Sequence, residues 1–571
     1  MNPSVSEVYQ RFVWNEELSE LASKLYDTPA LTMGAVFDET PPLLERYAKT
    51  QWHSGEKKTH VVEALISANR RLGVLTPKVK ANISKLYNGV VEAGHQTIVL
   101  GGPCYILNKA ATIARIAALG HDKDLQFAPL FFLADYDTVQ SELTNVRTPN
   151  VGQEGNLVGF PVEEGFEHSP VSAIPLPKSE WYTRVEESIR NSYRPLTRSL
   201  DSRVRVLHEE RLEHAMALTR WAYDNSKTLG EWGAKIMGRL FNIEGNLGIP
   251  LLPASDDSFR SVLVEGLELL LARRNRERFL AAHDAATFLI EENGFRAHIG
   301  ARTDSYVPFF YECSGKDCHR ARIQLAYQES GKTAVLSGKC PNCGDVVSIE
   351  TNTDTPDLSD VSNSLSPRVD SRQMAMDTLL PVVVHVGGTG ETAYYAQVIP
   401  VAKELGLPFP EVLKYPRVYF NTPWNEELAG TLSQKGLPTL HSPEMFKTIG
   451  RIARFRKKKA YEEMNSALAQ FDNQLQNSHM KLNHLLADLE SRRREEESRT
   501  SDDNLKTRLE LEKYLSWVYG QFTEGKIGQE ATWSWMEWAV NSGFPDLFGP
   551  YWRAYVAEMK NGATHFVNFT L

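Results

Sequence analysis

The sequence predicts an α/β fold built on a parallel sheet, and two strand–turn–helix units predict it. Residues 98–102 form a short β-branched run that stops at two glycines, and apolar residues at helical spacing follow over 105–119. Residues 381–386 form a second such run, also closed by two glycines, with a helix expected over 391–405. Strands that alternate with helices are typical of doubly wound sheets, whose ligands bind beyond the carboxyl ends of the strands.

The other segments predict that a long insertion splits this sheet. In chain order we expect helices over 5–93, a strand at 128–134, a surface loop over 150–180, helices over 180–240, a strand at 249–252, helices over 258–291 and a polar linker over 351–366. We therefore divide the chain into 1–160 (N-terminal helices and first part of the core), 161–300 (helical connecting region), 301–355 (zinc ribbon insertion), 356–440 (second part of the core), 441–519 (coiled coil) and 520–571 (C-terminal helical segment).

The bulk composition excludes several classes of protein. The 571 residues carry a formal charge of −9, and such a chain is a poor candidate for binding nucleic acid. No run of about 18 apolar residues predicts a membrane helix, and the N-terminus lacks the basic and apolar regions of a secretory signal. Only five cysteines occur, and four of them cluster, which favours a reducing cytoplasm and a metal site over disulfides.

The four clustered cysteines are spaced like the ligands of a zinc ribbon. Cys313 and Cys318 form one pair and Cys340 and Cys343 the other, with strand-like sequence between them. Four thiolates can hold Zn²⁺ tetrahedrally and leave no position open for water, so the metal should be structural. The alternative is four unrelated thiols.

Residues 464–489 predict a coiled coil. Apolar side chains recur there at alternating spacings of four and three, interrupted once by Ser478. A turn near 501–503 and a return helix would make the coiled coil antiparallel. We expect it to join two copies in a homodimer, although a helical hairpin can also satisfy its own seam within one subunit.

Three segments, in this order, resemble the BshC family, the cysteine-adding ligases of bacillithiol biosynthesis. The first is the glycine-glutamine loop and helix at 94–109, and the second is the strand at 129–134. The third, within 365–410, is the longest and most specific match. Together they cover about a third of the chain, which corresponds to the expected core.

This resemblance implies a Rossmann-like core with helical connecting insertions and a C-terminal coiled coil that pairs subunits. The family is assigned the last step of bacillithiol synthesis, in which cysteine is joined to glucosaminyl-malate, an amino-sugar malate. Making that amide requires an activated carboxyl group, so the resemblance also implies ATP and Mg²⁺.

The resemblance also points to the residues of the site. Its catalytic candidates are Asp137, Arg372, Asp377 and Glu391. Its substrate- or nucleotide-binding candidates are Gly94, Gln96, Gly102, Pro103, Tyr105, Lys109, Thr378, Gly387, Gly388, Tyr394 and Gln397. Two stretches far apart in the chain should thus line one pocket at the edge of the sheet. Lys109 could equally be a helix-surface lysine, and Glu391 could simply cap its helix.

The sequence departs from the family pattern after the second strand. Where the family usually has Gly-Glu-Asp-His-Asp, residues 135–139 keep only Asp137, and Thr138 replaces the histidine. Ile98 also replaces a usual glycine. Because histidine is the common proton carrier near neutral pH, a non-catalytic scaffold with the same fold stays open as an alternative. An RNA-linked ligase would suit a zinc ribbon but is opposed by the negative charge.

Overall fold

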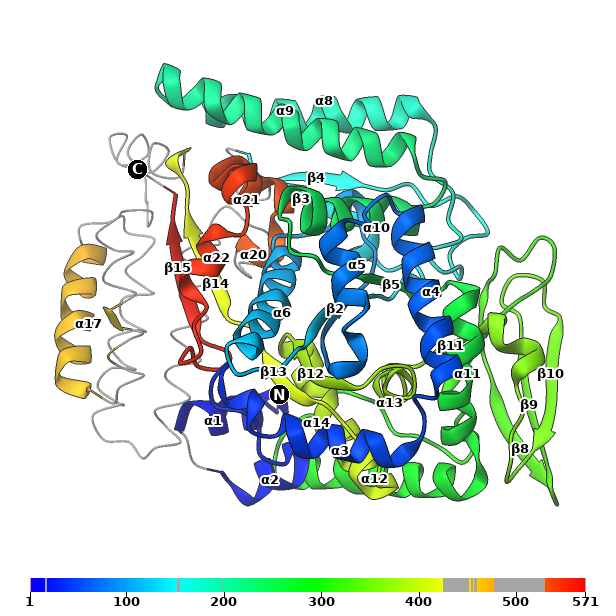
Figure 1. The fold of residues 1–571 in the computed structure, drawn as a ribbon. Coiled ribbons are helices and arrows are strands. Elements are labelled where there is room, and N and C mark those ends of the chain that lie inside the picture. The colour runs from blue at the N-terminus through cyan, green and yellow to red at the C-terminus, as the bar shows by residue number, and fades with distance from the viewer. Residues whose placement is uncertain are drawn as a thin grey trace.

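The structure, a computed structural model, describes residues 2–15, 18–150, 155–198, 200–424, 451–452, 455, 460–476 and 529–569. A central sheet lies between helices, a small β unit projects from one edge, and a pair of long helices lies across one end (Figure 1). Within the described residues, no helix is both long and apolar enough to span a bilayer.

The core is a five-stranded parallel sheet of order β13-β12-β1-β2-β5. Its strands are β1 (Val90–His95), β2 (Ala128–Leu133), β5 (Leu251–Pro253), β12 (Val382–Gly387) and β13 (Glu411–Lys414). The chain runs from β1 outward to β2 and β5, then returns to β12 on the other side of β1. The strand order therefore reverses beside β1, and at such a point the adjoining loops diverge and leave room for a ligand.

Each face of the sheet packs into its own hydrophobic core because side chains alternate along a strand. Val91 and Ala93 of β1 lie in the core that contains helix α6 (Tyr105–His121). Val90 belongs to a second core with α4 (Gly55–Arg71), α5 (Pro77–Ile83), α11 (Asp257–Leu271) and the cysteine-bearing unit. A third core joins α1 (Ser6–Asn15), α2 (Glu20–Tyr26), α12 (Arg273–Glu292) and α14 (Thr389–Leu405).

The first core strand lies earlier than the sequence predicts. It is β1, whereas residues 99–101 form the 3-10 turn η3, so both the strand expected at 98–102 and the helix expected up to residue 93 are wrong. The backbone explains the difference, because Leu100, Gly101 and Gly102 all have positive φ angles of 53°, 76° and 90°. No strand continues through that conformation. Trp535 fixes the turn by donating its indole N–H to the Leu100 carbonyl at 2.7 Å.

The connecting region is helical, as predicted. Its helices are α8 (Ser179–Arg198), α9 (Ser202–Asp224) and α10 (Leu229–Arg239), followed by the π-helical turn η4 (Leu240–Glu244). The loop expected over 150–180 is partly wrong, because β3 (Asn145–Thr148) pairs with β4 (Asn156–Gly159) there. Further helical elements of the first 420 residues are η1 (Ala35–Phe37), α3 (Thr40–Thr50), η2 (Leu86–Asn88), α7 (Ser141–Thr144) and α13 (Arg372–Asp377).

The cysteine-bearing unit consists of two small antiparallel sheets. Their strands are β6 (Phe309–Glu312), β7 (Arg322–Gln324), β8 (Ala326–Ser330), β9 (Thr333–Lys339), β10 (Val346–Asn352) and β11 (Leu365–Pro367). The orders are β11-β6-β7 and β10-β9-β8. The expected linker over 351–366 thus ends in the turn η5 (Ser359–Ser364) and in a strand that ties the unit back to the core.

The C-terminal segment returns to the core. Strand β15 (Thr564–Asn568) pairs in parallel with β14 (Arg417–Asn421), and the elements before it are α20 (Gln529–Thr532), α21 (Trp535–Ser542), η8 (Phe544–Asp546) and α22 (Gly549–Ala554). Of the predicted coiled coil, α17 (Tyr461–Gln476) is a helix, and the rest lies outside the described residues.

Candidate active site

A cavity of about 890 Å³ opens where the parallel strands end. Gly94 and His95 of β1, Ala134 after β2, Gly388 after β12 and Lys414 of β13 all line it. The cavity therefore lies where the strand order reverses, the position at which open α/β sheets bind ligands. Its volume is within the range of sites for small molecules and nucleotides.

The structure brings most of the predicted site residues to this cavity. Those that line it are Gly94, Gln96, Tyr105, Lys109, Asp137, Arg372, Gly388, Glu391 and Tyr394. The early glycine loop and the segment after β12 therefore share one pocket, although about 280 positions separate them in the chain.

Lys109 and Glu391 form a buried ion pair that joins these two segments. The Lys109 ammonium donates to a carboxylate oxygen of Glu391 and to the Gly94 carbonyl, the latter at 2.9 Å. The other Glu391 oxygen accepts from the Gly388 amide at 3.0 Å, so Glu391 also caps α14. Burial alone would raise the pKa of Glu391, but Lys109 outweighs it and the pKa falls to about 2. Neither residue is a surface side chain.

Arg372 forms an ion pair with a buried carboxylate. Its guanidinium donates to Glu92 of β1 at 2.5 Å and to the Tyr395 hydroxyl at 3.0 Å. Despite burial, which opposes ionisation, Arg372 and His385 lower the pKa of Glu92 to about 2. Glu92 therefore already neutralises the charge of Arg372. The part of the guanidinium that does not contact Glu92 or Tyr395 lines the cavity.

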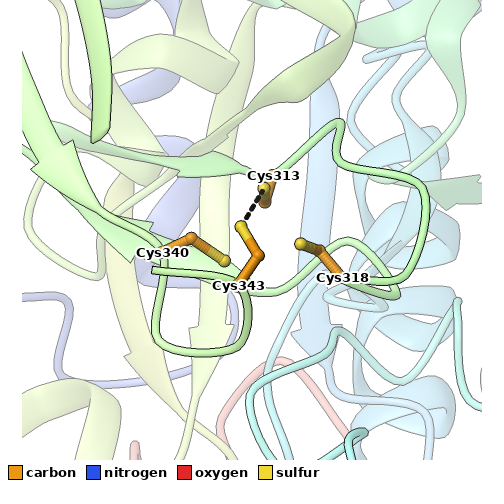
Figure 2. A group of neighbouring side chains, drawn as sticks. All are labelled: Cys313, Cys318, Cys340 and Cys343. Atoms are coloured by element: carbon orange, nitrogen blue, oxygen red, sulfur yellow. Dashed lines mark hydrogen bonds between the residues drawn. The ribbon is translucent and has the colours of Figure 1, made fainter. Parts of the chain in front are cut away.

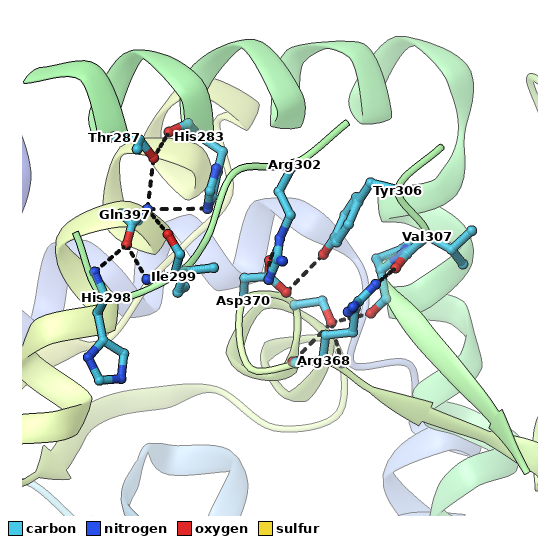
Figure 3. A network of polar contacts seen from close by, with 12 residues as sticks. His283, Thr287, His298, Ile299, Arg302, Tyr306, Val307, Arg368, Asp370 and Gln397 are labelled. Atoms are coloured by element: carbon cyan, nitrogen blue, oxygen red, sulfur yellow. Dashed lines mark hydrogen bonds and ion pairs between the residues drawn. The ribbon is translucent and has the colours of Figure 1, made fainter. Parts of the chain in front are cut away.

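The cysteine-bearing unit supplies the opposite wall. Arg322 of β7 donates to Asp137 at 3.2 Å and lies over the Phe310 ring at 4.2 Å. Arg302 and Tyr306 both donate to Asp370, at 2.6 and 2.8 Å (Figure 3).

Arg368, on the same wall, differs from its neighbours. It donates to the Val307 carbonyl at 3.3 Å (Figure 3). It also lies over the Phe310 ring at 4.5 Å. No ion pair with a carboxylate is found for it within the described part of the chain. Burial lowers the pKa of its guanidinium because the charged form loses hydration. An anionic ligand at this position would therefore contact a poorly hydrated positive charge.

Six predicted residues do not line the cavity: Gly102, Pro103, Asp377, Thr378, Gly387 and Gln397. Asp377 is fully buried in α13 and accepts from Gln373 at 3.0 Å, and burial raises its pKa well above the ordinary value. Asp377 is therefore placed as a buried packing group that the cavity does not reach. Gly387 lies beneath Glu391, where a Cβ would come within 2.6 Å of the Glu391 side chain.

Gln397 faces the side of α14 away from the cavity, contrary to the polar face expected from Glu391, Tyr394 and Gln397. Its carbonyl oxygen accepts from the Ile299 amide at 2.7 Å, and its amide group donates to Thr287 at 2.8 Å (Figure 3). Gln397 is six residues from Glu391, and at 3.6 residues per turn its side chain is rotated by about 120° from Glu391, into this buried network.

Several lining residues are not among those predicted from the sequence. His95, Arg368 and His385 lie within the segments that resemble the family, and the others come from other segments: His298, Arg302, Arg322, Lys414, Tyr415, Arg417 and Glu530. Glu530 arrives from α20 and accepts from Asn108 of α6 at 2.5 Å and from the Val418 amide at 2.9 Å. Only the return of the C-terminal segment places it there.

The four cysteines come together as the spacing predicts. Their sulfur atoms all lie within 4.8 Å of one another, and Cys313 and Cys343 are 4.0 Å apart (Figure 2). Four thiolates about 2.3 Å from one zinc ion would be separated by about 3.8 Å, so the cluster fits a tetrahedral metal. The Gly315 amide donates to Cys313 at 3.4 Å, and a Cβ on Gly315 would approach the Cys318 sulfur to 2.8 Å.

This cysteine cluster is linked to the cavity wall through a loop. Asn342, between the last two cysteines, donates to the Gly165 carbonyl at 2.8 Å, and His319 stacks on Phe166 at 4.0 Å. Further along, the Val171 amide donates to the Asp137 carbonyl at 2.9 Å. The loop therefore connects the cluster to the backbone of Asp137, whose carboxylate already pairs with Arg322.

Comparison with known proteins decides the family. The model described as "Bacillithiol biosynthesis BshC, N-terminal Rossmann-like domain" matches residues 12–418. The chain belongs to the BshC family. The matched range contains the whole parallel sheet and most of the cavity, and leaves out Tyr419, Glu530, Ala531 and Gly562.

The BshC relatives are distant. Proteins from Cytophaga hutchinsonii, Chloroherpeton thalassium and Halalkalibacterium halodurans, each named "Putative cysteine ligase BshC", are 23%, 24% and 24% identical over 367, 355 and 427 residues. These alignments cover 63%, 60% and 72% of this chain and 59%, 54% and 64% of the relatives. The chain therefore matches less than two thirds of their length.

Proposed function

We propose that this chain is a ligase that forms an amide between cysteine and glucosaminyl-malate or a related amino-sugar acceptor, giving a low-molecular-weight thiol. The observation that carries the proposal is the shared cavity of the Gly94–Lys109 and Gly388–Tyr394 segments, at the point where the strand order reverses. Both segments lie in stretches that resemble the family, and the second belongs to the longest and most specific match.

The charges of the cavity support an anionic substrate. Seven lining residues are Lys or Arg, whereas the lining carboxylates are Asp137, Glu142, Glu391 and Glu530. Malate carboxylates or nucleotide phosphates would offset this surplus, since guanidinium groups bind both with paired hydrogen bonds. Arg368 is the best placed cation, because its guanidinium has no carboxylate partner in the described ranges.

ATP and Mg²⁺ belong to the proposal as co-substrate and its ion. The cavity is large enough for a nucleotide beside a second substrate. Mg²⁺ commonly takes one or two carboxylates and completes its shell with phosphate oxygens and water, so Glu142 or Asp137 would suffice.

Zinc is proposed for Cys313, Cys318, Cys340 and Cys343, in a structural role. All four ligand positions would be sulfur, so no site is left on the metal for chemistry. Its contribution would be to hold the β6–β7 region, and with it Arg322 and Phe310, against the cavity.

The oligomeric state is a further part of the proposal. The helical segment around α17 would pair two copies in a cytoplasmic homodimer.

A non-catalytic scaffold is the second candidate function. It is favoured by Thr138, which stands at the family's histidine position and forms a β-bridge with Pro170.

One assay separates these functions. The purified protein is incubated with cysteine, ATP, Mg²⁺ and glucosaminyl-malate, and the thiol product is sought by mass spectrometry. Product that disappears when any single substrate is omitted supports the ligase. No product, together with no binding of cysteine, ATP or acceptor by calorimetry, would leave the scaffold as the function.

A further inference from the structure

Three histidines line the cavity, and their hydrogen bonding distinguishes them. Both ring nitrogens of His95 are occupied, by the Gln96 carbonyl at 2.9 Å and the Tyr105 hydroxyl at 2.7 Å. His298 is exposed, and its ring lies 6.1 Å from the Tyr394 ring. His385 has no hydrogen-bond partner on either ring nitrogen among the described residues.

His385 is buried, so this lack of hydrogen-bond partners costs free energy. The side chain is only 2% exposed, yet it borders the cavity from the carboxyl end of β12. An imidazole buried without partners loses its hydrogen bonds to water and gains none in return. Nearly all buried polar groups in proteins are hydrogen-bonded. An imidazole that lines a cavity without a hydrogen-bond partner therefore points to a ligand that supplies one.

A carboxylate lies behind this imidazole. Glu92 is the neighbour of His385 in the sheet register, and its carboxylate oxygen is 3.7 Å from His385 Nδ1. The other groups that face the ring are Arg372 of α13 and Glu391 and Tyr395 of α14, with Tyr395 edge-on at 5.1 Å. A buried carboxylate behind a histidine orients the ring and stabilises its protonated form, as in acid–base catalysis by hydrolases.

We propose that His385, backed by Glu92, is the proton acceptor of the amide-forming step, an inference that rests on the proposed ligase function. His385 would replace, from a different strand, the histidine that the family pattern places at Thr138. His95 is not available for this role because both its nitrogens are engaged.

In this step the neutral amine of the amino sugar attacks the activated carboxyl carbon of cysteine. The new C–N bond uses the nitrogen lone pair, and the bond from that carbon to the phosphate or nucleotide oxygen breaks, so the leaving group departs as an anion. The nitrogen of the new bond is then positively charged and must lose one proton to become a neutral amide. His385 Nε2 takes that proton, and Glu92 stabilises the resulting imidazolium.

The test combines substitution with chemical rescue. In His385→Ala, kcat should fall by about 10²- to 10⁴-fold, the usual contribution of a general base, while KM for each substrate changes by less than about threefold. Added imidazole should restore at least about tenfold of kcat, because it can enter the space that the ring leaves. His60→Ala, an exposed histidine outside the cavity, is the control and should neither lose activity nor respond to imidazole.

The pH profile supplies a second readout. Burial lowers the pKa of His385 although Glu92 opposes it, so the base is neutral at pH 7, and kcat of the wild type should fall only under acidic conditions. That acidic limb should be absent from the near-isosteric His385→Asn, which also serves if His385→Ala fails to fold.

The outcomes separate this inference from the function on which it rests. A wild type that makes no amide removes both. A wild type that makes the amide while folded His385→Ala or His385→Asn keeps kcat within about threefold, or loses activity through KM alone, or ignores imidazole, overturns the role of His385 and leaves the ligase intact.

Discussion

At the scale of single residues, the Lys109–Glu391 pair should dominate the stability of the site. Removing the carboxylate in Glu391→Gln leaves a buried ammonium, and we expect a loss of about 3 kcal/mol in the free energy of unfolding at pH 7. Because the pKa of Glu391 is lowered from 4.5 to about 2, the stabilisation is full above pH 4.5 and is lost as the pH falls toward 2. Urea unfolding of both proteins between pH 7 and pH 3 measures this.

A matched exposed pair provides the control for that experiment. Lys24 and Glu20 also form a Lys–Glu ion pair, but on the surface of α2. Glu20→Gln should leave the unfolding free energy nearly unchanged at every pH, because solvent screens the pair. Equal effects of the two substitutions would contradict the buried placement of Glu391.

Glu537 should limit stability at alkaline pH. This buried carboxyl accepts from the Trp424 indole at 3.0 Å, and burial raises its pKa from 4.5 to about 8. A raised pKa contributes stability at low pH, and this is lost as the pH rises from about 4.5 to 8. Glu537→Gln keeps the acceptor and cannot ionise, so its melting temperature should exceed that of the wild type by an amount that grows between pH 6 and pH 9. A constant difference would show that Glu537 does not titrate there.

Individual residues were predictable where a local motif fixes their direction. Lys109 and Glu391 each lie in the first turns of a helix that follows a core strand or turn, so their approach to the strand ends follows from the fold. Asp377 and Gln397 lie in the same motif, but helical periodicity and burial turn them elsewhere. Arg322 and Arg368 had no local signal, because they reach the cavity only through the packing of the cysteine-bearing unit.

At the scale of elements, that unit depends on its cysteine cluster. Cys340→Ser should abolish the binding of one zinc ion per chain, measured by mass spectrometry of the metal, and should lower the melting temperature. Cys104→Ala is the matched control, since Cys104 is buried in the main core away from the cluster and its loss should leave the metal content unchanged. Zinc retained in full by Cys340→Ser would rule out a four-cysteine site.

The elements also show why spacing predicts some structures better than others. The cysteine spacing restricts four sulfur atoms to one place, and the structure brings them together. The run at 98–102 has the composition of a strand, but it turns through positive φ angles, and its Leu100 carbonyl accepts from Trp535, more than 430 positions later. A segment whose conformation is decided by a distant contact cannot be assigned from its own residues.

At the scale of the whole molecule, the doubly wound parallel sheet and the family were predictable, but the closure of the cavity was not. Alternation of strands and helices indicates a doubly wound sheet, and the sheet has the reversal that such folds use for binding. By contrast, Glu530 joins the cavity through its contacts with Asn108 and the Val418 amide, and Gly562 joins it just before β15 pairs with β14. Nothing in the C-terminal sequence alone specifies that partner.

The distribution of charge over the whole chain leads to a last prediction. The protein has a formal charge of −9, yet its cavity is lined by more cations than carboxylates, so small anions should bind there and stabilise the fold. Inorganic pyrophosphate at about 100 times its dissociation constant would add about 2.7 kcal/mol, a rise of a few degrees in melting temperature. Arg368→Gln should remove most of this rise. Arg553→Gln is the control, because Arg553 is an exposed arginine that pairs with Asp546 on the surface, and it should keep the full rise. A rise that survives Arg368→Gln, or that disappears completely at 1 M salt, would place the anion outside the cavity, since screening over about 3 Å at that ionic strength suppresses exposed contacts first.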